Sequence, residues 1–146
     1  MKIFIDADHN GFELKQVIIS ALTRQGIDVV DMGGGTLDPG DDYPHVAGRV
    51  AQAVLTDSDA RGILICGSGQ GVCIAANRYK GIRATLCWDN YEAKASRNDD
   101  DANILCLPAR VLDSEKAITV LHTWLNTPFA GATRFKRRIK QLDELA

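Results

Sequence analysis

Residues 62–77 of the chain read GILICGSGQGVCIAAN and combine three kinds of local structure in one short stretch. The opening apolar run is typical of a buried strand, and the closing run of small apolar residues is typical of a helix. Between them, glycines at positions 67, 69 and 71 favour a tight turn. Backbone N–H groups in such a turn, together with the positive end of the helix dipole, are suited to binding an anion. Because Cys66 is the last residue before the turn, a thiol is expected at the edge of this anion site.

Apolar segments alternate with amphipathic segments along the whole chain, which predicts an α/β fold with a parallel sheet covered on both faces. Strands are expected at residues 2–7, 27–32, 62–66, 83–88 and 103–107, and helices at 11–25, 44–55, from the glycine turn to about 79, 91–97, 114–126 and 133–144. The predicted architecture is a three-layer Rossmann-like sandwich with the strand order 2-1-3-4-5 and a basic C-terminal helix. The length of 146 residues fits a single domain, residues 1–146.

This topology places the ends of the first and third strands side by side, at the crevice where ligands bind in open α/β sheets. The loop after the first strand carries Asp8 and His9, and the loop after the third strand carries Cys66 and Ser68. The sequence therefore predicts a carboxylate, an imidazole, a thiol and a hydroxyl at one site.

The composition argues against several other functions. With 17 basic and 19 acidic residues the net charge is −2, so no nucleic-acid partner is expected. No apolar run approaches the roughly 20 residues that span a bilayer, and the chain opens on a strand-like segment instead of a signal peptide, so we expect a cytoplasmic protein with no membrane partner. The cysteines at 66, 73, 87 and 106 lack metal-site spacing, and the three histidines are far apart. No metal site is therefore expected.

The glycine turn alone also fits three other classes of protein, and each conflicts with a residue of this chain. A dinucleotide-binding fingerprint requires a glycine where Val72 stands. A cysteine phosphatase requires an arginine at the same position. A receiver domain requires an aspartate where Cys66 stands.

The chain resembles the ribose-5-phosphate isomerase B family, which includes the galactose-6-phosphate isomerase subunits, over nearly its full length. The resemblance rests on five groups of residues: DHNGFELK at 8–15, DYP at 42–44, GILICGSG at 62–69, AAN at 75–77 with GIRA at 81–84, and SR at 96–97 with DAN at 101–103. It implies an aldose–ketose isomerase without metal or cofactor, whose default reaction converts ribose 5-phosphate to ribulose 5-phosphate through a cis-enediolate. It also implies a homodimer, with a tetramer left open.

The resemblance further implies roles for individual residues. Cys66 is the expected base, and Ser68 stands where the family commonly has a threonine that assists proton transfer between the substrate oxygens. The amides of Gly67, Gly69 and Gly71 are the expected oxyanion hole. The remaining expected contacts are Asp8 and Tyr43 with the sugar, and His9, Arg110, Arg134 and Arg138 with the phosphate, some of them from a second subunit.

Three residues depart from the family pattern. Asp99 and Asp100 replace a His-Asn pair, in which the histidine is the usual candidate for opening the furanose ring and the asparagine is associated with the oxyanion hole. Phe135 replaces a second histidine of the tail motif. Either Asp99 opens the ring as a general acid and base, or the substrate needs little ring opening, as a tetrose 4-phosphate would. A hexose 6-phosphate substrate and a non-catalytic sugar-phosphate-binding module also remain open.

Overall fold

The computed structural model describes residues 1–145 and contains a five-stranded sheet in which every neighbouring pair is parallel. The strands are β1 (Lys2–Ala7), β2 (Asp28–Asp31), β3 (Arg61–Cys66), β4 (Ala84–Leu86) and β5 (Ile104–Pro108). The helices are α1 (Phe12–Arg24), α2 (Tyr43–Val54), α3 (Gln70–Ala76), α4 (Asn90–Asp100), α5 (Ser114–Asn126) and α6 (Thr133–Asp143).

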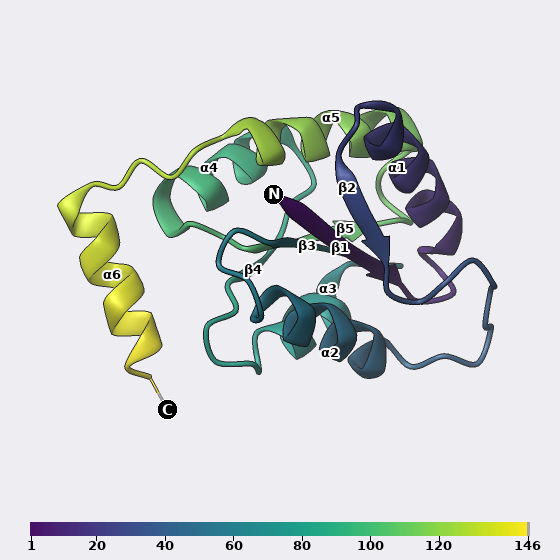
Figure 1. Ribbon diagram of the computed structural model, residues 1–146, viewed down its shortest axis with the longest axis horizontal. Coiled ribbons are helices and arrows are strands. Elements are labelled where there is room, and N and C mark those ends of the chain that lie inside the picture. The colour runs from purple at the N-terminus through teal and green to yellow at the C-terminus, as the bar shows by residue number, and fades with distance from the viewer. Residues whose placement is uncertain (146) are drawn as a thin grey trace.

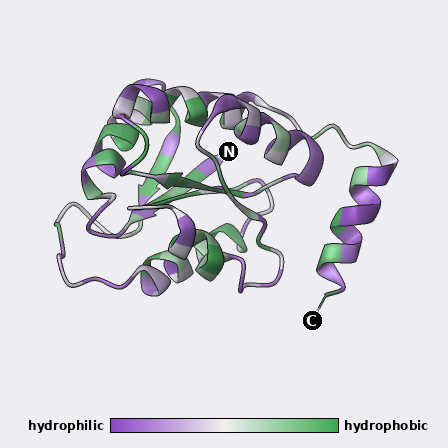
Figure 2. Cartoon of the chain, turned by 180° about the vertical axis from the view of Figure 1, so that it is seen from behind, coloured by the Kyte–Doolittle hydropathy of each residue, from purple (hydrophilic) through white to green (hydrophobic). Residues whose placement is uncertain are grey.

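The helices cover both faces of the sheet, as Figure 1 shows. One apolar core joins α1, α4 and α5 to one face, and a second joins α2 and α3 to the other. The middle strands β3 and β5 are almost entirely buried because helices cover both of their faces. In Figure 2 these strands form the hydrophobic centre of the molecule. The predicted α/β three-layer fold with a parallel sheet is confirmed.

The predicted strand order 2-1-3-4-5 is wrong, because the sheet has the order β2-β1-β3-β5-β4. The apolar β5 pairs directly with β3, whereas the three-residue β4, which contains Thr85, takes the edge. The chain therefore passes from β3 to the edge strand β4 and then returns to β5, which lies between those two strands. Because parallel crossovers are right-handed, the return step places α4 on the face of α1 and α5 rather than beside α3.

Helix α4 is longer than predicted and ends at Asp100, so Asp99 and Asp100 lie in its last turn instead of in a solvated loop. Asp89 caps the start of this helix by accepting a hydrogen bond from the backbone N–H of Glu92. Asp101 ends it in the left-handed conformation, with φ of 47°. The predicted basic C-terminal helix is present as α6, and it stands away from the sheet in both Figure 1 and Figure 2.

The register of the central strands fixes what lies at the carboxyl edge of the sheet. Ala7 of β1 pairs with Ile65 of β3, and Cys66 pairs with Pro108 of β5. The backbone N–H of Asp8 continues this ladder by donating to the carbonyl of Ile65. The loops that follow β1, β3 and β5 therefore meet at one place.

Candidate functional site

Cys66 ends β3 with its side chain 5 % exposed, at the point where the chain turns into α3. The backbone N–H of Gly69 donates to its Sγ at 3.1 Å. Gly69 has φ of 73°, a conformation that favours glycine, and it is the N-cap residue immediately before α3. The expected thiol at the edge of an amide-rich turn is therefore present in the structure.

The rest of the turn is enclosed by two side chains from other elements. Arg110 follows β5, and its side chain lies against the backbone of Gly67. Its backbone N–H donates to the carbonyl of Gly67 at 3.0 Å. The ring of Tyr43, at the start of α2, lies so close to Gly71 that a methyl group there would be 2.9 Å from it. Ser68 is exposed at the tip of the turn. Cys66, Gly67, Gly71, Tyr43 and Arg110 are thus brought together as predicted.

The loop after β1 adds Asp8 and His9 to the same edge. Asp8 is buried, and its Oδ1 accepts hydrogen bonds from the backbone N–H groups of Asn10 and Gly11, at 2.9 and 3.3 Å. The side chain of Asn10 accepts a hydrogen bond from Nη2 of Arg110 at 3.0 Å, which joins this loop to the one after β5. His9 is exposed, and its Nδ1 lies 2.8 Å from Oδ1 of Asp41.

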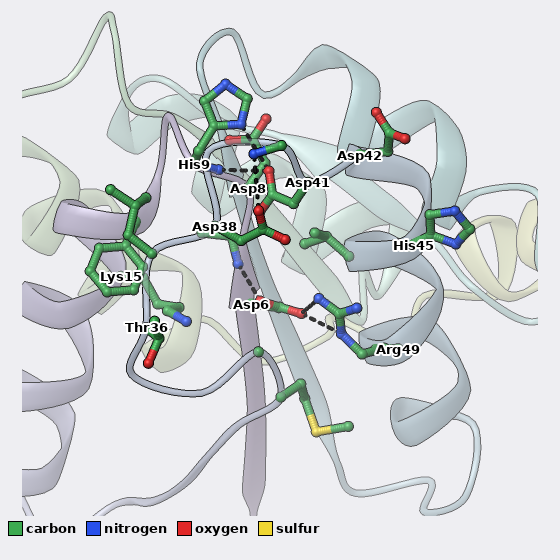
Figure 3. Close-up of a pocket in the computed structure, with 17 residues that line it drawn as sticks. Asp6, Asp8, His9, Lys15, Thr36, Asp38, Asp41, Asp42, His45 and Arg49 are labelled. Carbon is green, nitrogen blue, oxygen red and sulfur yellow. Dashed lines mark hydrogen bonds and ion pairs between the residues drawn. The ribbon is translucent and has the colours of Figure 1, made fainter.

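A cavity of about 550 Å³ extends from Asp8 and His9 toward α2 and the loop of residues 33–42. Figure 3 shows its polar lining, in which the carboxylate of Asp6 forms the floor and is held by Arg49. Asp6 is 1 % exposed, and its Oδ2 lies 2.9 Å from Nε and 2.8 Å from Nη2 of Arg49. Burial raises the pKa of Asp6, and the Arg49 guanidinium opposes that shift only in part.

The other predicted residues lie at the opposite edge of the sheet. Asp99 and Asp100 end α4 just before β5, where the carbonyl of Asn103 accepts from the N–H of Gly62 near the start of β3. Cys66 is the last residue of the six-residue strand β3. At the usual rise per residue it lies about 16 Å from the start of that strand. Arg134 and Arg138 lie on α6, and the segment just before α6 is tied to α4 by a hydrogen bond from the N–H of Ala130 to the carbonyl of Asn98. Asp99, Asp100, Arg134 and Arg138 are therefore not part of the Cys66 site of the same chain.

The electrostatics of this second edge are mixed. Burial and the neighbouring Asp99 raise the pKa of Asp100, while Arg138 and Arg83 lower it. The Oδ1 of Asp99 accepts a hydrogen bond from the side-chain amide of Asn98 at 2.7 Å. Asp100 thus lies near Arg83 and Arg138, whereas the side chain of Asp99 contacts Asn98.

Three residues at the Cys66 edge were missed by sequence reasoning: Asn10, Asp41 and Arg49. Asn10 adjoins the predicted His9 and could have been inferred from that position. Asp41 lies in a loop with several aspartates, and Arg49 lies on an amphipathic helix, so neither has a distinguishing local signal.

Within residues 1–145, no three histidine, cysteine, aspartate or glutamate side chains are placed to hold a metal ion together. Across the same residues, none of the helices has the length and apolarity needed to cross a membrane.

Comparison with known proteins gives consistent matches along nearly the whole chain. The family model described as Ribose/Galactose Isomerase matches residues 3–142. The ribose 5-phosphate isomerase structure from Thermotoga maritima is similar with a TM-score of 0.94 and 44 % identity, covering 99 % of this chain and 98 % of that one. The ribose-5-phosphate isomerase B structure from Mycoplasma genitalium, with bound ribulose 5-phosphate, has a TM-score of 0.93 and 41 % identity, covering 97 % of this chain and 93 % of that one.

A further relative carries a different substrate in its name. The D-erythrulose-4-phosphate isomerase of Pectobacterium atrosepticum is 37 % identical over 90 % of this chain and 86 % of its own length. The family match over residues 3–142 and the agreement of the folds lead to one conclusion. The chain belongs to the ribose/galactose isomerase family.

Proposed function

We propose that the protein is an aldose–ketose isomerase that interconverts ribose 5-phosphate and ribulose 5-phosphate, with Cys66 as the base. The observation that carries this proposal is the contact between the Cys66 Sγ and the Gly69 N–H at 3.1 Å, inside a turn of backbone amides. A cysteine that is only structural does not need amides directed at its sulfur. The ribose 5-phosphate isomerases of Thermotoga maritima and Mycoplasma genitalium share this fold at more than 40 % identity.

The proposed step moves one proton between two carbons. In its thiolate form Cys66 takes the proton from C2 of the open-chain aldose, and the electron pair of that C–H bond forms the C1–C2 double bond of a cis-enediolate. The amides of Gly67, Gly69 and Gly71 stabilise the negative charge that develops on the substrate oxygen. The hydroxyl of Ser68 carries a proton from O2 to O1, and the Cys66 thiol returns its proton to C1 to give the ketose. The step uses only these side chains and amides.

Charge pairing indicates where the phosphate binds. The two basic side chains that line the cavity of Figure 3 already have partners, because Arg49 pairs with Asp6 and Lys15 pairs with Asp31 at 2.9 Å. Within residues 1–145 Arg110 has no carboxylate oxygen within 4 Å of its guanidinium. Arg110 is therefore the unpaired cation of this edge, and His9, whose Nδ1 is paired with Asp41, keeps its other ring nitrogen for a phosphate. Asp8 and Tyr43 lie at the same edge and are proposed to contact the sugar.

The opposite edge is proposed to complete the site of a second subunit. Arg134 and Arg138 are exposed and lie one helical turn apart on α6, a spacing that suits capture of one phosphate. They cannot reach Cys66 of their own chain across the sheet. A homodimer in which α6 of each subunit lies against the carboxyl edge of the other would bring all of the predicted residues together.

A tetrose 4-phosphate is the second candidate substrate. Such a sugar cannot close a furanose ring through its phosphorylated O4, so it needs no ring-opening group. Asp99, Asp100 and Phe135 stand where the family has residues associated with ring opening and the oxyanion hole. The Pectobacterium relative named for D-erythrulose 4-phosphate adds support, since it is 37 % identical to this chain.

The test is an isomerisation assay with ribose 5-phosphate, D-erythrulose 4-phosphate and a hexose 6-phosphate, run with the wild type and with Cys66→Ala. The proposal predicts turnover of ribose 5-phosphate by the wild type and its loss in the variant. Turnover of the tetrose alone would contradict the ribose assignment and support the second candidate. Exchange of the C2 hydrogen with deuterated solvent separates an enzyme from a binding module, because binding without exchange would contradict both candidates.

A further inference from the structure

One carboxylate oxygen of Asp41 accepts two hydrogen bonds from His9. Its Oδ1 lies 3.0 Å from the backbone nitrogen of His9 and 2.8 Å from Nδ1 of the ring. An ionised carboxylate can only accept, so the ring nitrogen is the donor in the second hydrogen bond and the proton lies on Nδ1. Figure 3 shows this nitrogen turned toward Asp41, while the other ring nitrogen points away from the loop.

The loop that carries Asp41 is anchored from beneath. Oδ1 of Asp31 accepts from the N–H groups of Gly33 and Gly34, both at 3.1 Å, and from Nζ of Lys15. The Lys15 ammonium also donates to the carbonyl of Gly34 at 2.8 Å, and its side chain is 2 % exposed. The loop therefore starts at an ion pair whose lysine is buried, and it ends at Asp42, the residue that precedes α2, so Asp41 lies next to a fixed element.

The charges around His9 come from three directions. Asp41 lies on the loop of residues 33–42, Asp8 precedes His9 in the chain, and Arg110 approaches from the loop after β5. The hydrogen bond to Asp41 is the main cause that raises the pKa of His9, with Asp8 acting in the same sense and Arg110 against it. The net effect is a raised pKa, and in the protonated ring the second N–H, on Nε2, is free to donate.

We propose that Asp41 is a positioning residue that holds His9 with its Nε2–H directed at the substrate, so that His9 and Arg110 bind the phosphate as a pair. The inference deepens the proposed function, because it assigns the phosphate to this chain's own edge and names the residue that prepares it. Asp41 does not contact the phosphate. The Asp41 carboxylate can lie near the substrate phosphate because its negative charge is paired with His9.

The pH dependence follows from the state of His9. The imidazolium persists below the raised pKa, so phosphate binding is strong there and weakens as the pH rises through that value. Without Asp41 the pKa falls back and the same weakening begins at lower pH. The ligand itself gains its second negative charge near pH 6, so wild type and variant must be compared at the same pH.

The experiment follows the His9 ring protons by NMR in the resting protein and measures the affinity for inorganic phosphate, in the wild type and in Asp41→Asn. Asp38→Asn is the matched control, since Asp38 lies on the same loop and lines the same cavity, but its carboxylate accepts only from the N–H of Gly40. Signals absent in His9→Gln assign the ring.

We expect Asp41→Asn to lower the titration midpoint of His9 and to weaken phosphate binding about fivefold near neutral pH, with no difference well above the wild-type midpoint. In the assay KM should rise by the same factor with kcat unchanged, and Asp41→Glu should restore part of both effects. An Asp41→Asn protein with the wild-type midpoint and wild-type phosphate affinity would overturn the proposal. The titration of His9 and the affinity for inorganic phosphate are both measured without a sugar, so they test the inference even if the isomerase assignment fails.

Discussion

The two edges of the sheet carry different kinds of site. At the carboxyl edge the thiol, its turn and the flanking side chains are held by backbone hydrogen bonds and by two ion pairs that each have one buried partner. At the amino edge Arg134 and Arg138 lie exposed on a helix that touches its own chain mainly at α4. The difference is one of anchoring: the carboxyl edge is held together by contacts within one chain, whereas the two α6 arginines are exposed and open to a second chain.

The largest expected effect falls on the thiol of the carboxyl edge. Cys66→Ala removes the proposed base and should lower kcat by about a thousandfold, the usual contribution of a general base, with little change in KM. The measurement is steady-state kinetics with ribose 5-phosphate. Cys73→Ala is the control, because Cys73 is a half-buried thiol on α3 whose polar partners are the carbonyl of Ala84, the amide of Asn77 and the thiol of Cys106. Retention of most of the activity in Cys66→Ala would remove the mechanism.

The next effect compares a glycine of each edge. An alanine methyl at Gly69 would clash with Leu86 and lie 3.2 Å from the backbone of Leu107, in addition to the cost of φ at 73°. Gly69→Ala should lower the free energy of unfolding by about 3 kcal/mol. Gly131, just before α6, has φ of 67° but open surroundings, so Gly131→Ala should cost about 1 kcal/mol. Urea unfolding measures both, and equal losses would mean that the turn is not tightly packed.

The smallest of the expected stability effects compares an ion pair of each edge. Arg49→Ala leaves the buried carboxylate of Asp6 without its partner and should cost about 2 kcal/mol at neutral pH. Lys140→Ala breaks an exposed pair with Glu144 on α6 and should change stability by less than about 0.5 kcal/mol.

The Arg49→Ala loss should also depend on pH. The pKa of Asp6 is already raised by burial, and losing Arg49 raises it further. The deficit is therefore present above the folded-state pKa and fades as the pH falls through it, because the neutral carboxyl needs no partner. Unfolding measured from neutral to acidic pH checks this, and a deficit that grows on acidification would contradict the assignment.

Much of the carboxyl edge could be predicted from the sequence because it depends on local signals. A buried apolar run followed by alternating glycines specifies the strand, the turn and the position of the thiol, whatever the strand order. The separation of the two edges is not a local property. It follows from α4 running back to the start of β3, and the two aspartates at its end could be placed only once that helix was known to reach Asp100.

The strand order and the partner of His9 were not predictable for related reasons. The order depends on whether Ile104–Pro108 or Ala84–Leu86 pairs with β3, and both segments read as strands. The partner of His9 depends on which aspartate of the loop reaches it. Asp38, Asp41 and Asp42 look alike in sequence, and only the folded loop places Asp41 2.8 Å from the ring.

The most direct test of the central claim is complementation between two inactive variants. Cys66→Ala lacks the base, and the double variant Arg134→Ala/Arg138→Ala lacks the α6 cations, so each alone should be inactive or nearly so. If the site joins the carboxyl edge of one chain to α6 of another, refolding an equal mixture creates hybrids with one intact site and recovers about a quarter of the wild-type activity. Hybrids that form, as judged by native mass spectrometry, but show no recovered activity would contradict a site shared between subunits.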